Sequence, residues 1–376
     1  MKILFLSRKD SIFVKELIEN LIIKYNFEIE LIDIFHFEHI WFTKKKIKKI
    51  SFYPKKFPQN LYLKYLLSIP CSYIYIKKLN KTYDYIHMFY KKFQYYFLIN
   101  LLKNKSKKIY LSIFGSDFYK NPIKIFDKPF YKYTNLITFT NKETQLQFNY
   151  LYNQTLTQKT ILCPFGQTNH DFIDKIKKNE SKDKSKKILD IPKNKIVICC
   201  GSNGYPNEQH EQIINQLSKI KNKSKITLVF PITYGATSQR INKIKEMVKT
   251  KLIDFKTIII DQYLSSEDLA RLRICTDILI NVRKTDQISG AMLESIYAGS
   301  TIITGSWLPY KSLDQAHVNL QKISKISNLQ KKLLYCINNN VGLKKQNKKN
   351  HTYIGTTYNW NSALPKWNKM YNFQST

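Results

Sequence analysis

The sequence predicts an α/β protein made of two Rossmann-like, doubly wound parallel-sheet domains. Short apolar strands alternate with helical stretches along most of the 376 residues, and the strands end in small or polar residues. A Lys-rich segment at 175–193 separates two such series and is the expected linker. The length and the 43% content of hydrophobic residues allow each domain a core of its own. We place the domains at 1–172 and 173–355, followed by a last segment at 356–376.

The first series opens as a βαβ unit. A buried strand at 3–7 leads into a helix at 12–24, for which Ser11 is the expected N-cap. The next strand follows at 28–34. Arg8 comes directly after the first strand, at the sheet edge where ligands bind in such folds, so a contact with an acceptor and a solvated loop cation both stay open. The other elements expected in this half are a helix at 61–67 and strands at 83–88, 107–113, 136–139 and 160–162.

The second series repeats this pattern. Its first strand, at 195–200, runs into the glycine turn Gly201-Ser202-Asn203-Gly204. The turn lacks both the Lys of a P-loop and the spacing of a dinucleotide fingerprint, so a tight strand-to-helix connection and a backbone approach to substrate both stay open. The stretch Ser265-Ser266-Glu267-Asp268 is expected to cap a helix that runs to Arg273. The other elements expected here are helices at 208–220, 240–249 and 360–371, and strands at 225–230, 257–260, 278–282 and 301–303.

The segment at 285–305 predicts a helix between two of these strands. The helix begins at Ser289-Gly290-Ala291, where unpaired backbone amides and the positive end of the helix dipole favour a phosphate group. Glu294 follows about one turn later, where its carboxylate can accept the two vicinal hydroxyls of a ribose. A solvated helix carboxylate is the alternative for Glu294. A nucleotide would satisfy both features of this segment.

The net charge of +35 indicates an anionic partner, but its composition weakens that inference. Nearly all 62 basic residues are Lys, only five are Arg, and Ile, Asn, Tyr and Phe are abundant, as an AT-rich genome produces. No nucleic-acid-binding motif accompanies the charge, so nucleic acid is not an expected partner. In the segment 41–58, Lys clusters alternate with aromatic residues, which suits either an anionic membrane surface or a solvated loop with a few core anchors.

The cysteine and histidine residues predict neither a metal site nor a disulfide framework. The six Cys show no CxxC spacing, and His36 with His39 forms a close pair without a third ligand nearby. No apolar run reaches the ~18 residues of a membrane span. These features favour a cytoplasmic protein with reduced thiols. His87, expected at a strand end, is either a cleft group or a core histidine, and Asp117 is either an N-cap or a group that faces an acceptor hydroxyl.

The segment 285–305 resembles the donor-binding segment of glycosyltransferases with the GT-B fold. In that segment two acidic residues eight apart flank a small-residue turn, and Asp286 and Glu294 match the spacing, although Glu is usual at the first position. Other segments resemble the branch of 4-acetamido-4,6-dideoxygalactosyltransferases, which use a TDP-sugar and a lipid-linked acceptor. These segments are 113–119, 163–165, 197–208, 229–235 and 269–277.

The resemblance implies a GT-B enzyme whose two domains face across a cleft. The domain at 1–172 would bind the acceptor, the domain at 173–355 would bind the donor, and the helix at 356–376 would return to the first domain. Glu294 would bind ribose, Ser289, Gly290 and Ala291 the diphosphate, Arg283 would be a counter-charge, and Tyr263 would lie near the base. The full set of candidates is Asp117, His87 and Asp286 for catalysis, Glu294, Ser289, Gly290, Ala291, Arg283, Gly201, Ser202, Asn203, Tyr263 and Gln287 for the donor, and Arg8, Gly115 and Ser116 for the acceptor.

We therefore expect a metal-independent hexosyltransferase without a cofactor. Its donor would be a UDP-, TDP- or GDP-linked sugar, and its acceptor a glycan or a lipid-linked molecule in bacterial surface polysaccharide, lipopolysaccharide or glycolipid synthesis. Its expected location is the cytoplasm, with peripheral contact at the inner face of the cell membrane. A non-catalytic GT-B-like protein that binds a nucleotide-sugar or acts as a scaffold is the alternative.

Overall fold

The computed structural model describes residues 1–42, 47–52, 61–119, 127–152, 159–221 and 223–372. Its contacts divide the chain into two compact units. Unit 1 contains Met1–Gly166 and Trp360–Thr376, and unit 2 contains Gln167–Asn359. The chain passes from one unit to the other after Gly166 and again after Asn359, and both positions lie within six residues of the boundaries expected at 172 and 355. The segment from Trp360 onward belongs to unit 1.

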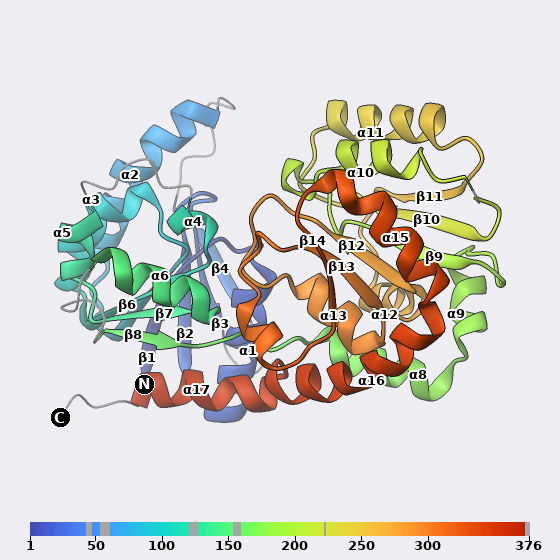
Figure 1. Ribbon diagram of the computed structural model, residues 1–376. Coiled ribbons are helices and arrows are strands. Elements are labelled where there is room, and N and C mark those ends of the chain that lie inside the picture. The colour runs from blue at the N-terminus through green and yellow to red at the C-terminus, as the bar shows by residue number, and fades with distance from the viewer. Residues whose placement is uncertain (43–46, 53–60, 120–126, 153–158, 222, 373–376) are drawn as a thin grey trace. The chain divides into compact units, whose positions relative to one another are not determined.

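Unit 1 is built on an eight-stranded sheet in the order β4-β3-β2-β1-β5-β6-β7-β8 (Figure 1). Its strands are parallel except at β3, which runs antiparallel to both of its neighbours. The sheet is therefore mixed at one edge, whereas the sequence predicted parallel strands throughout. The strands are β1 (Lys2–Leu6), β2 (Glu28–Asp33), β3 (Glu38–Phe42), β4 (Ile47–Ser51), β5 (Tyr83–Phe89), β6 (Ser106–Ile113), β7 (Leu136–Phe139) and β8 (Thr160–Leu162).

Helices cover both faces of this sheet. One face packs against α2, α3, α5 and α6, and the other packs against α1 and α17, which lie side by side in Figure 1. The helix α2 continues through Pro70, a residue that usually ends a helix, and so extends well beyond the stretch predicted at 61–67. The helices of unit 1 are α1 (Ile12–Tyr25), α2 (Leu61–Lys78), α3 (Phe93–Lys103), α4 (Ser116–Tyr119), α5 (Asp127–Lys132), α6 (Lys142–Tyr152) and α17 (Trp360–Asn372).

The segment 41–58 lies partly outside the described residues. Within the described part, Trp41 and Phe42 end β3, and the whole of β4 is exposed. The strand β4 forms the edge of the sheet next to β3. Its exposed Lys48 and Lys49 are typical of strands that avoid edge-to-edge pairing. Whether this segment touches a membrane stays a prediction.

Unit 2 contains a six-stranded, fully parallel sheet in the order β11-β10-β9-β12-β13-β14. Numbered from its own first strand, this is the 3-2-1-4-5-6 order of a dinucleotide-binding fold, in which ligands bind where the order reverses. The reversal lies between β9 and β12. The strands are β9 (Ile196–Cys200), β10 (Ile226–Pro231), β11 (Lys256–Ile260), β12 (Ile278–Asn281), β13 (Thr301–Gly305) and β14 (Leu320–Ile323).

The linker prediction at 175–193 was wrong, because two helices occupy most of this segment. Ser181 caps the second of them by accepting a hydrogen bond from the Lys184 amide, and Lys is a good helix former. Within the described residues, no helix has the length and apolar character that a membrane span requires. The helices of unit 2 are α8 (Asn169–Asn179), α9 (Lys182–Ile188), η2 (Pro206–Glu208), α10 (His210–Leu217), α11 (Ser238–Lys251), α12 (Ser266–Cys275), α13 (Gly290–Ala298), α14 (Lys311–Gln315), η3 (Ile326–Asn328), α15 (Leu329–Asn338) and α16 (Asn340–Thr357).

Candidate active site

Two loops meet at the reversal point of the unit 2 sheet, one after β9 and one after β12. Asn207 in the first loop donates from Nδ2 to the Thr285 carbonyl (2.7 Å), and its Oδ1 accepts from the Thr285 amide (3.1 Å). The Asn207 carbonyl also accepts from the Lys284 amide (3.0 Å). Gln209 in turn donates to the Val282 carbonyl. These bonds hold the two loops together at the place where ligands bind in this sheet order.

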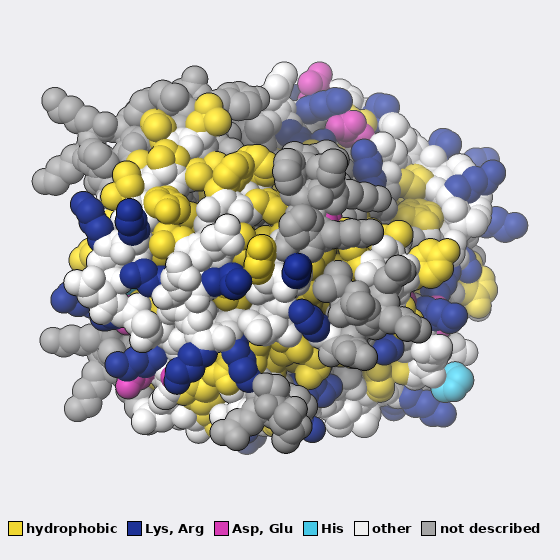
Figure 2. Space-filling model, turned by 90° about the vertical axis from the view of Figure 1, so that its left-hand side faces the viewer, with side chains coloured by type: hydrophobic (Ala, Val, Ile, Leu, Met, Phe, Trp, Pro, Cys, Tyr) yellow, Lys and Arg dark blue, Asp and Glu magenta, His cyan; other side chains and the backbone are white. Residues whose placement is uncertain are grey.

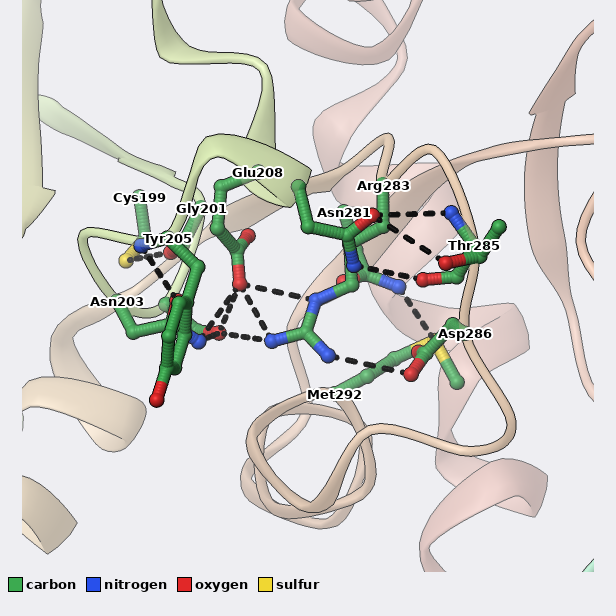
Figure 3. Close-up of polar contacts among 12 residues, drawn as sticks. Cys199, Gly201, Asn203, Tyr205, Glu208, Asn281, Arg283, Thr285, Asp286 and Met292 are labelled. Carbon is green, nitrogen blue, oxygen red and sulfur yellow. Dashed lines mark hydrogen bonds and ion pairs between the residues drawn. The ribbon is translucent and has the colours of Figure 1, made fainter. Parts of the chain in front are cut away.

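Arg283 connects the same two loops through its guanidinium (Figure 3). Its Nε donates to Glu208 Oε1 (2.9 Å), its Nη1 donates to Asp286 Oδ1 (3.1 Å), and its Nη2 donates to Glu208 Oε1 and to Ser202 Oγ. Burial lowers the pKa of Arg283, but the Asp286 and Glu208 carboxylates outweigh burial and raise that pKa above its usual value. Because four hydrogen bonds occupy a group with five N–H donors, little of Arg283 is left to act as the expected counter-charge.

Glu208 is the central acceptor of this network, and sequence reasoning did not select it. Its Oε1 accepts from Ser202 (2.9 Å), Asn203 (2.8 Å) and Arg283, while its Oε2 is buried without a hydrogen-bond partner in the described part of the chain. Gly201 adopts a φ of +77°, and a Cβ built there would lie 3.0 Å from Glu208 Oε2. Gly201, Ser202 and Asn203, which the sequence predicts as donor-site residues, therefore surround a buried carboxylate.

Asp286 is held inside the protein on both carboxylate oxygens. Oδ1 accepts from Arg283, and Oδ2 accepts from the Tyr310 hydroxyl. Its side chain is 9% exposed. The carboxylate thus anchors the loop that leads into α13, and its contact with a donor sugar stays a prediction.

The N-terminus of α13 has the form that the sequence predicts. Ser289 is the N-cap, and its carbonyl accepts from the amides of Met292 and Leu293. The amides of Gly290 and Ala291 donate to no residue that the structure describes. Gln287, which lies shortly before these two residues in the sequence, is buried. Two amides are therefore available to an anion at the positive end of the helix.

Glu294, the predicted ribose ligand, forms an ion pair with Arg273 at the end of α12. Arg273 Nε donates to Glu294 Oε2 (2.9 Å), and Arg273 is only 4% exposed. Burial lowers the pKa of Arg273, but Glu294, Cys199 and Tyr234 together raise that pKa above its usual value. Among the described residues, nothing accepts from the terminal nitrogens of Arg273 or donates to Glu294 Oε1. This pair thus presents free donors and a free acceptor within the described part of the chain, and the sequence predicted for Arg273 no role beyond ending a helix.

Three tyrosines follow three adjacent strands of the same sheet. Tyr263 follows β11 and stacks on Tyr234 with ring centroids 5.8 Å apart and planes 5° apart. Tyr234 follows β10 and meets Tyr205 edge to face at 6.0 Å. Gly235, at φ +82°, leaves room for the Tyr205 ring, since a Cβ there would lie 2.5 Å from that ring. Tyr263, the predicted neighbour of a base, is therefore the exposed end of an aromatic cluster.

His87 is a core residue, which corrects its assignment as a catalytic candidate. It lies within β5 and is fully buried, with Nδ1 bonded to the Tyr371 hydroxyl and Nε2 bonded to Ser112 Oγ (2.8 Å). Burial lowers its pKa to about 3, so the ring is neutral at ordinary pH. Both ring nitrogens are occupied, and no acceptor can reach them.

Asp117 is likewise a structural group. Its Oδ2 accepts from the Lys91 amide (2.7 Å) and its Oδ1 accepts from the Phe114 amide (3.0 Å), which ties the ends of β5 and β6 together. The residue is 5% exposed, and burial raises the pKa of its carboxyl group to about 6. It lies in the first turn of α4 and is not an N-cap. Both oxygens thus serve the fold, and a catalytic role for Asp117 stays a prediction.

The acceptor candidates lie at the carboxyl edge of the unit 1 sheet. Arg8 follows β1 and pairs with Asp10, both more than half exposed. Gly115 follows β6 with a φ of +98° and accepts hydrogen bonds from two amides of α4, the helix that Ser116 begins. The strands β1 and β6 are separated by β5 in the sheet, so these candidates follow two strands that are not neighbours.

Lys92 lies at the same edge, directly before α3, and sequence reasoning missed it. It is 7% exposed, and its Nζ lies 4.1 Å from the centre of the Phe35 ring and has no hydrogen-bond acceptor among the described residues. Burial lowers its pKa to about 7, against 10.5 for an unperturbed lysine.

Replacing Lys92 with Met is expected to raise the unfolding temperature, and more so at pH 6 than at pH 10. The unfolded chain keeps the lysine proton up to about pH 10.5 while the folded chain loses it near pH 7. The wild type is therefore penalised fully below pH 7, and the penalty fades as pH rises to 10.5. Thermal unfolding at both pH values measures this, with the exposed Lys78→Met as control. Equal gains at both pH values would contradict it.

Within the described residues, no group of three His, Cys, Asp or Glu side chains could hold a metal ion. Independence from metal and cofactor stays a prediction. The residues that the structure does bring together in unit 2 form an anion-ready helix end, an Arg–Glu pair with free polar atoms, and an aromatic cluster.

Two Rossmann-like units with these sheets have the GT-B fold, and solved structures with similar folds are numerous. Sucrose-phosphate synthase from Thermosynechococcus elongatus aligns with a TM-score of 0.75 at 13% identity, over 99% of this chain and 98% of that one. A glycosyltransferase from Rickettsia africae aligns at 0.70 and 15% identity, over 99% and 97%. HepE from Anabaena, solved in complex with UDP and glucose, aligns at 0.70 and 11% identity over the full length of both chains. No family model and no curated protein sequence matches this chain.

Proposed function

We propose that the protein is a glycosyltransferase that takes a sugar from a nucleotide-sugar bound by unit 2. The observation that carries this proposal is the ion pair between Arg273 on α12 and Glu294 on α13, because α13 is also the helix whose first amides, at Gly290 and Ala291, have no acceptor among the described residues. A nucleoside diphosphate carries an anion and a pair of ribose hydroxyls, and these two features are complementary to it.

In this proposal the diphosphate accepts hydrogen bonds from the amides of Gly290 and Ala291 and from the terminal nitrogens of Arg273. Glu294 Oε1 accepts from the ribose hydroxyls. As the sugar leaves, negative charge grows on the diphosphate, and fixed amide and guanidinium donors stabilise that charge without rearrangement. Arg283 acts indirectly by holding the two loops in place.

The similar structures support this choice of ligand. HepE was solved with UDP and glucose and with UDP-glucose, and starch synthase IV from Arabidopsis thaliana was solved with ADP and acarbose. The nucleobase of the donor of this protein stays open among the UDP-, TDP- and GDP-sugars. The resemblance of the sequence to 4-acetamido-4,6-dideoxygalactosyltransferases favours a TDP-linked sugar.

For the acceptor we propose a glycan or a lipid-linked molecule bound by unit 1, in surface polysaccharide or glycolipid synthesis. Arg8 and the turn at Gly115 lie at the sheet edge where such a ligand would bind. We further propose hexosyl transfer without a metal ion, since the amides of Gly290 and Ala291 and the guanidinium of Arg273 supply the charge stabilisation.

A non-catalytic protein that binds a nucleotide-sugar is the second candidate. It is favoured by His87, Asp117 and Asp286, whose polar atoms all serve the fold. Incubation with a panel of nucleotide-sugars and lipid-linked acceptors, with mass-spectrometric detection of products, tests transfer directly. Calorimetry with UDP, TDP and GDP tests binding. Product formation supports the enzyme, and binding without any product supports the second candidate.

Replacing Tyr263 with Ala is expected to weaken nucleotide binding by about 5- to 10-fold, which matches the worth of one aromatic stacking contact. Because Tyr263 is 73% exposed, the unfolding temperature should not change. Calorimetric titration with UDP and TDP measures the affinity. The matched control is Tyr150→Ala, which changes an exposed tyrosine of unit 1. Unchanged affinity in the Tyr263 variant would show that the nucleobase does not contact this aromatic cluster.

A further inference from the structure

Two helices of unit 1 expose apolar side chains on their outer faces. On α2, Leu66, Tyr73 and Ile74 follow the i, i+7, i+8 spacing of a single helix face, and Leu66 is 67% exposed. On α3, Phe93 and Phe97 are exposed and contact each other edge to face at 5.0 Å. The two helices pack against each other on the same side of the sheet. We call these five side chains the α2–α3 face.

The inner faces of both helices are apolar too. Ile76 of α2 and Tyr95, Leu98 and Leu102 of α3 belong to the core below them. A helix that is apolar on both sides is typical of a buried element, yet these helices lie on the surface. Figure 2, which views the side where Figure 1 labels α2, α3 and α5, shows hydrophobic side chains gathered there beside Lys and Arg side chains. The α2–α3 face therefore lacks a covering partner among the described residues.

The charge of this region favours an anionic partner. Residues 39–116 contain seventeen Lys, and Asp84 is their only acidic residue. Neither α2 nor α3 contains an Asp or Glu, and exposed Lys77, Lys78 and Lys103 lie at the ends of the two helices. Lysines at the rim of an aliphatic and aromatic surface match an anionic lipid headgroup layer above an acyl region. Proteins contact nucleic acids through polar and stacking groups, and the aliphatic side chains of Leu66 and Ile74 make neither kind of contact.

We propose that the α2–α3 face docks the protein onto the surface of an anionic lipid bilayer. Leu66, Ile74 and Phe97 enter the boundary between headgroups and acyl chains, while Lys77, Lys78 and Lys103 contact the anionic headgroups. The docking is peripheral, and it involves helices outside the segment 41–58. It does not depend on the proposed transfer reaction, because it needs only the surface of unit 1.

Vesicle flotation tests this docking. The wild type is mixed with vesicles of phosphatidylcholine alone or of phosphatidylcholine with 30% phosphatidylglycerol, at low and at high salt, together with a variant carrying Leu66→Ser, Ile74→Ser and Phe97→Ser. A matched control carries Ile253→Ser, Tyr335→Ser and Val341→Ser, three exposed apolar side chains of unit 2. Calorimetry with UDP and thermal unfolding check that each variant is folded.

The wild type should float with anionic vesicles and lose binding as salt rises, because screening weakens the lysine contribution. The α2–α3 variant should lose at least tenfold in affinity, and the unit 2 control should retain it. Equal flotation of the wild type and the α2–α3 variant would overturn the proposal. So would failure of the wild type to bind anionic vesicles at low salt, or an equal loss in the unit 2 control.

Discussion

Replacing Glu294 with Gln is expected to reduce nucleotide affinity by about 10- to 100-fold and to abolish measurable transfer. The carboxylate is the acceptor proposed for the ribose hydroxyls, and hydrogen bonds to a charged group contribute about 1.5–3 kcal/mol. The same change removes the negative charge of the only hydrogen-bond partner that Arg273 has within the described residues. A buried guanidinium without its carboxylate destabilises a fold by about 3 kcal/mol. Calorimetry with UDP and TDP, and thermal unfolding, measure the two effects separately.

The double variant Arg273→Met, Glu294→Gln separates binding from folding. The double variant lacks the buried guanidinium, so no unpaired charge remains beside the neutral Gln. The unfolding temperature should therefore recover toward that of the wild type. Nucleotide affinity should stay low, because both proposed ligand groups are gone. Recovery of affinity together with stability would show that Glu294 supports the fold and does not touch the donor.

Replacing Glu208 with Gln is expected to have the second largest effect. Glu208 is 1% exposed and accepts from Ser202, Asn203 and Arg283. Loss of its charge leaves Arg283 with Asp286 as its remaining carboxylate and should destabilise unit 2 by about 2–3 kcal/mol. The two loops at the reversal point should loosen, which weakens nucleotide binding.

Hydrogen exchange of the loops after β9 and β12, with and without UDP, measures this loosening, and thermal unfolding measures the stability. Ser202→Ala is the matched control, since it removes only hydrogen bonds of a hydroxyl and should cost about 1 kcal/mol. A Glu208 variant as stable and as protected as the Ser202 variant would contradict the central role of this carboxylate.

The part of the site that lies on one stretch of chain could be predicted from the sequence. The strand, turn and helix around Ser289 and Gly290 follow from local apolar spacing and the glycine stop at Gly299, and the structure confirms them. The cap at Ser265 is confirmed for the same reason, since its side chain accepts from the Asp268 amide three residues later.

The parts that depend on distant residues could not be predicted. Arg273 and Glu294 meet only because α12 packs against α13. Glu208 is central because Arg283, 75 residues later, reaches it across the reversal of the sheet. His87 resembles a cleft group in sequence, but it is fully buried and is hydrogen-bonded to Tyr371, which lies 284 residues away. Local patterns contain none of these pairings.

The hydrogen bond between His87 and Tyr371 has a consequence for the order in which the two units can fold during synthesis. The aromatic core on one face of the unit 1 sheet includes Leu364, Trp367 and Tyr371 of α17. The ribosome synthesises α17 after the whole of unit 2, so the first unit to begin is the last that can be completed. Unit 2 is continuous in sequence and can fold first. A nascent chain released before α17 would carry an open apolar surface on unit 1, which is a surface for chaperones.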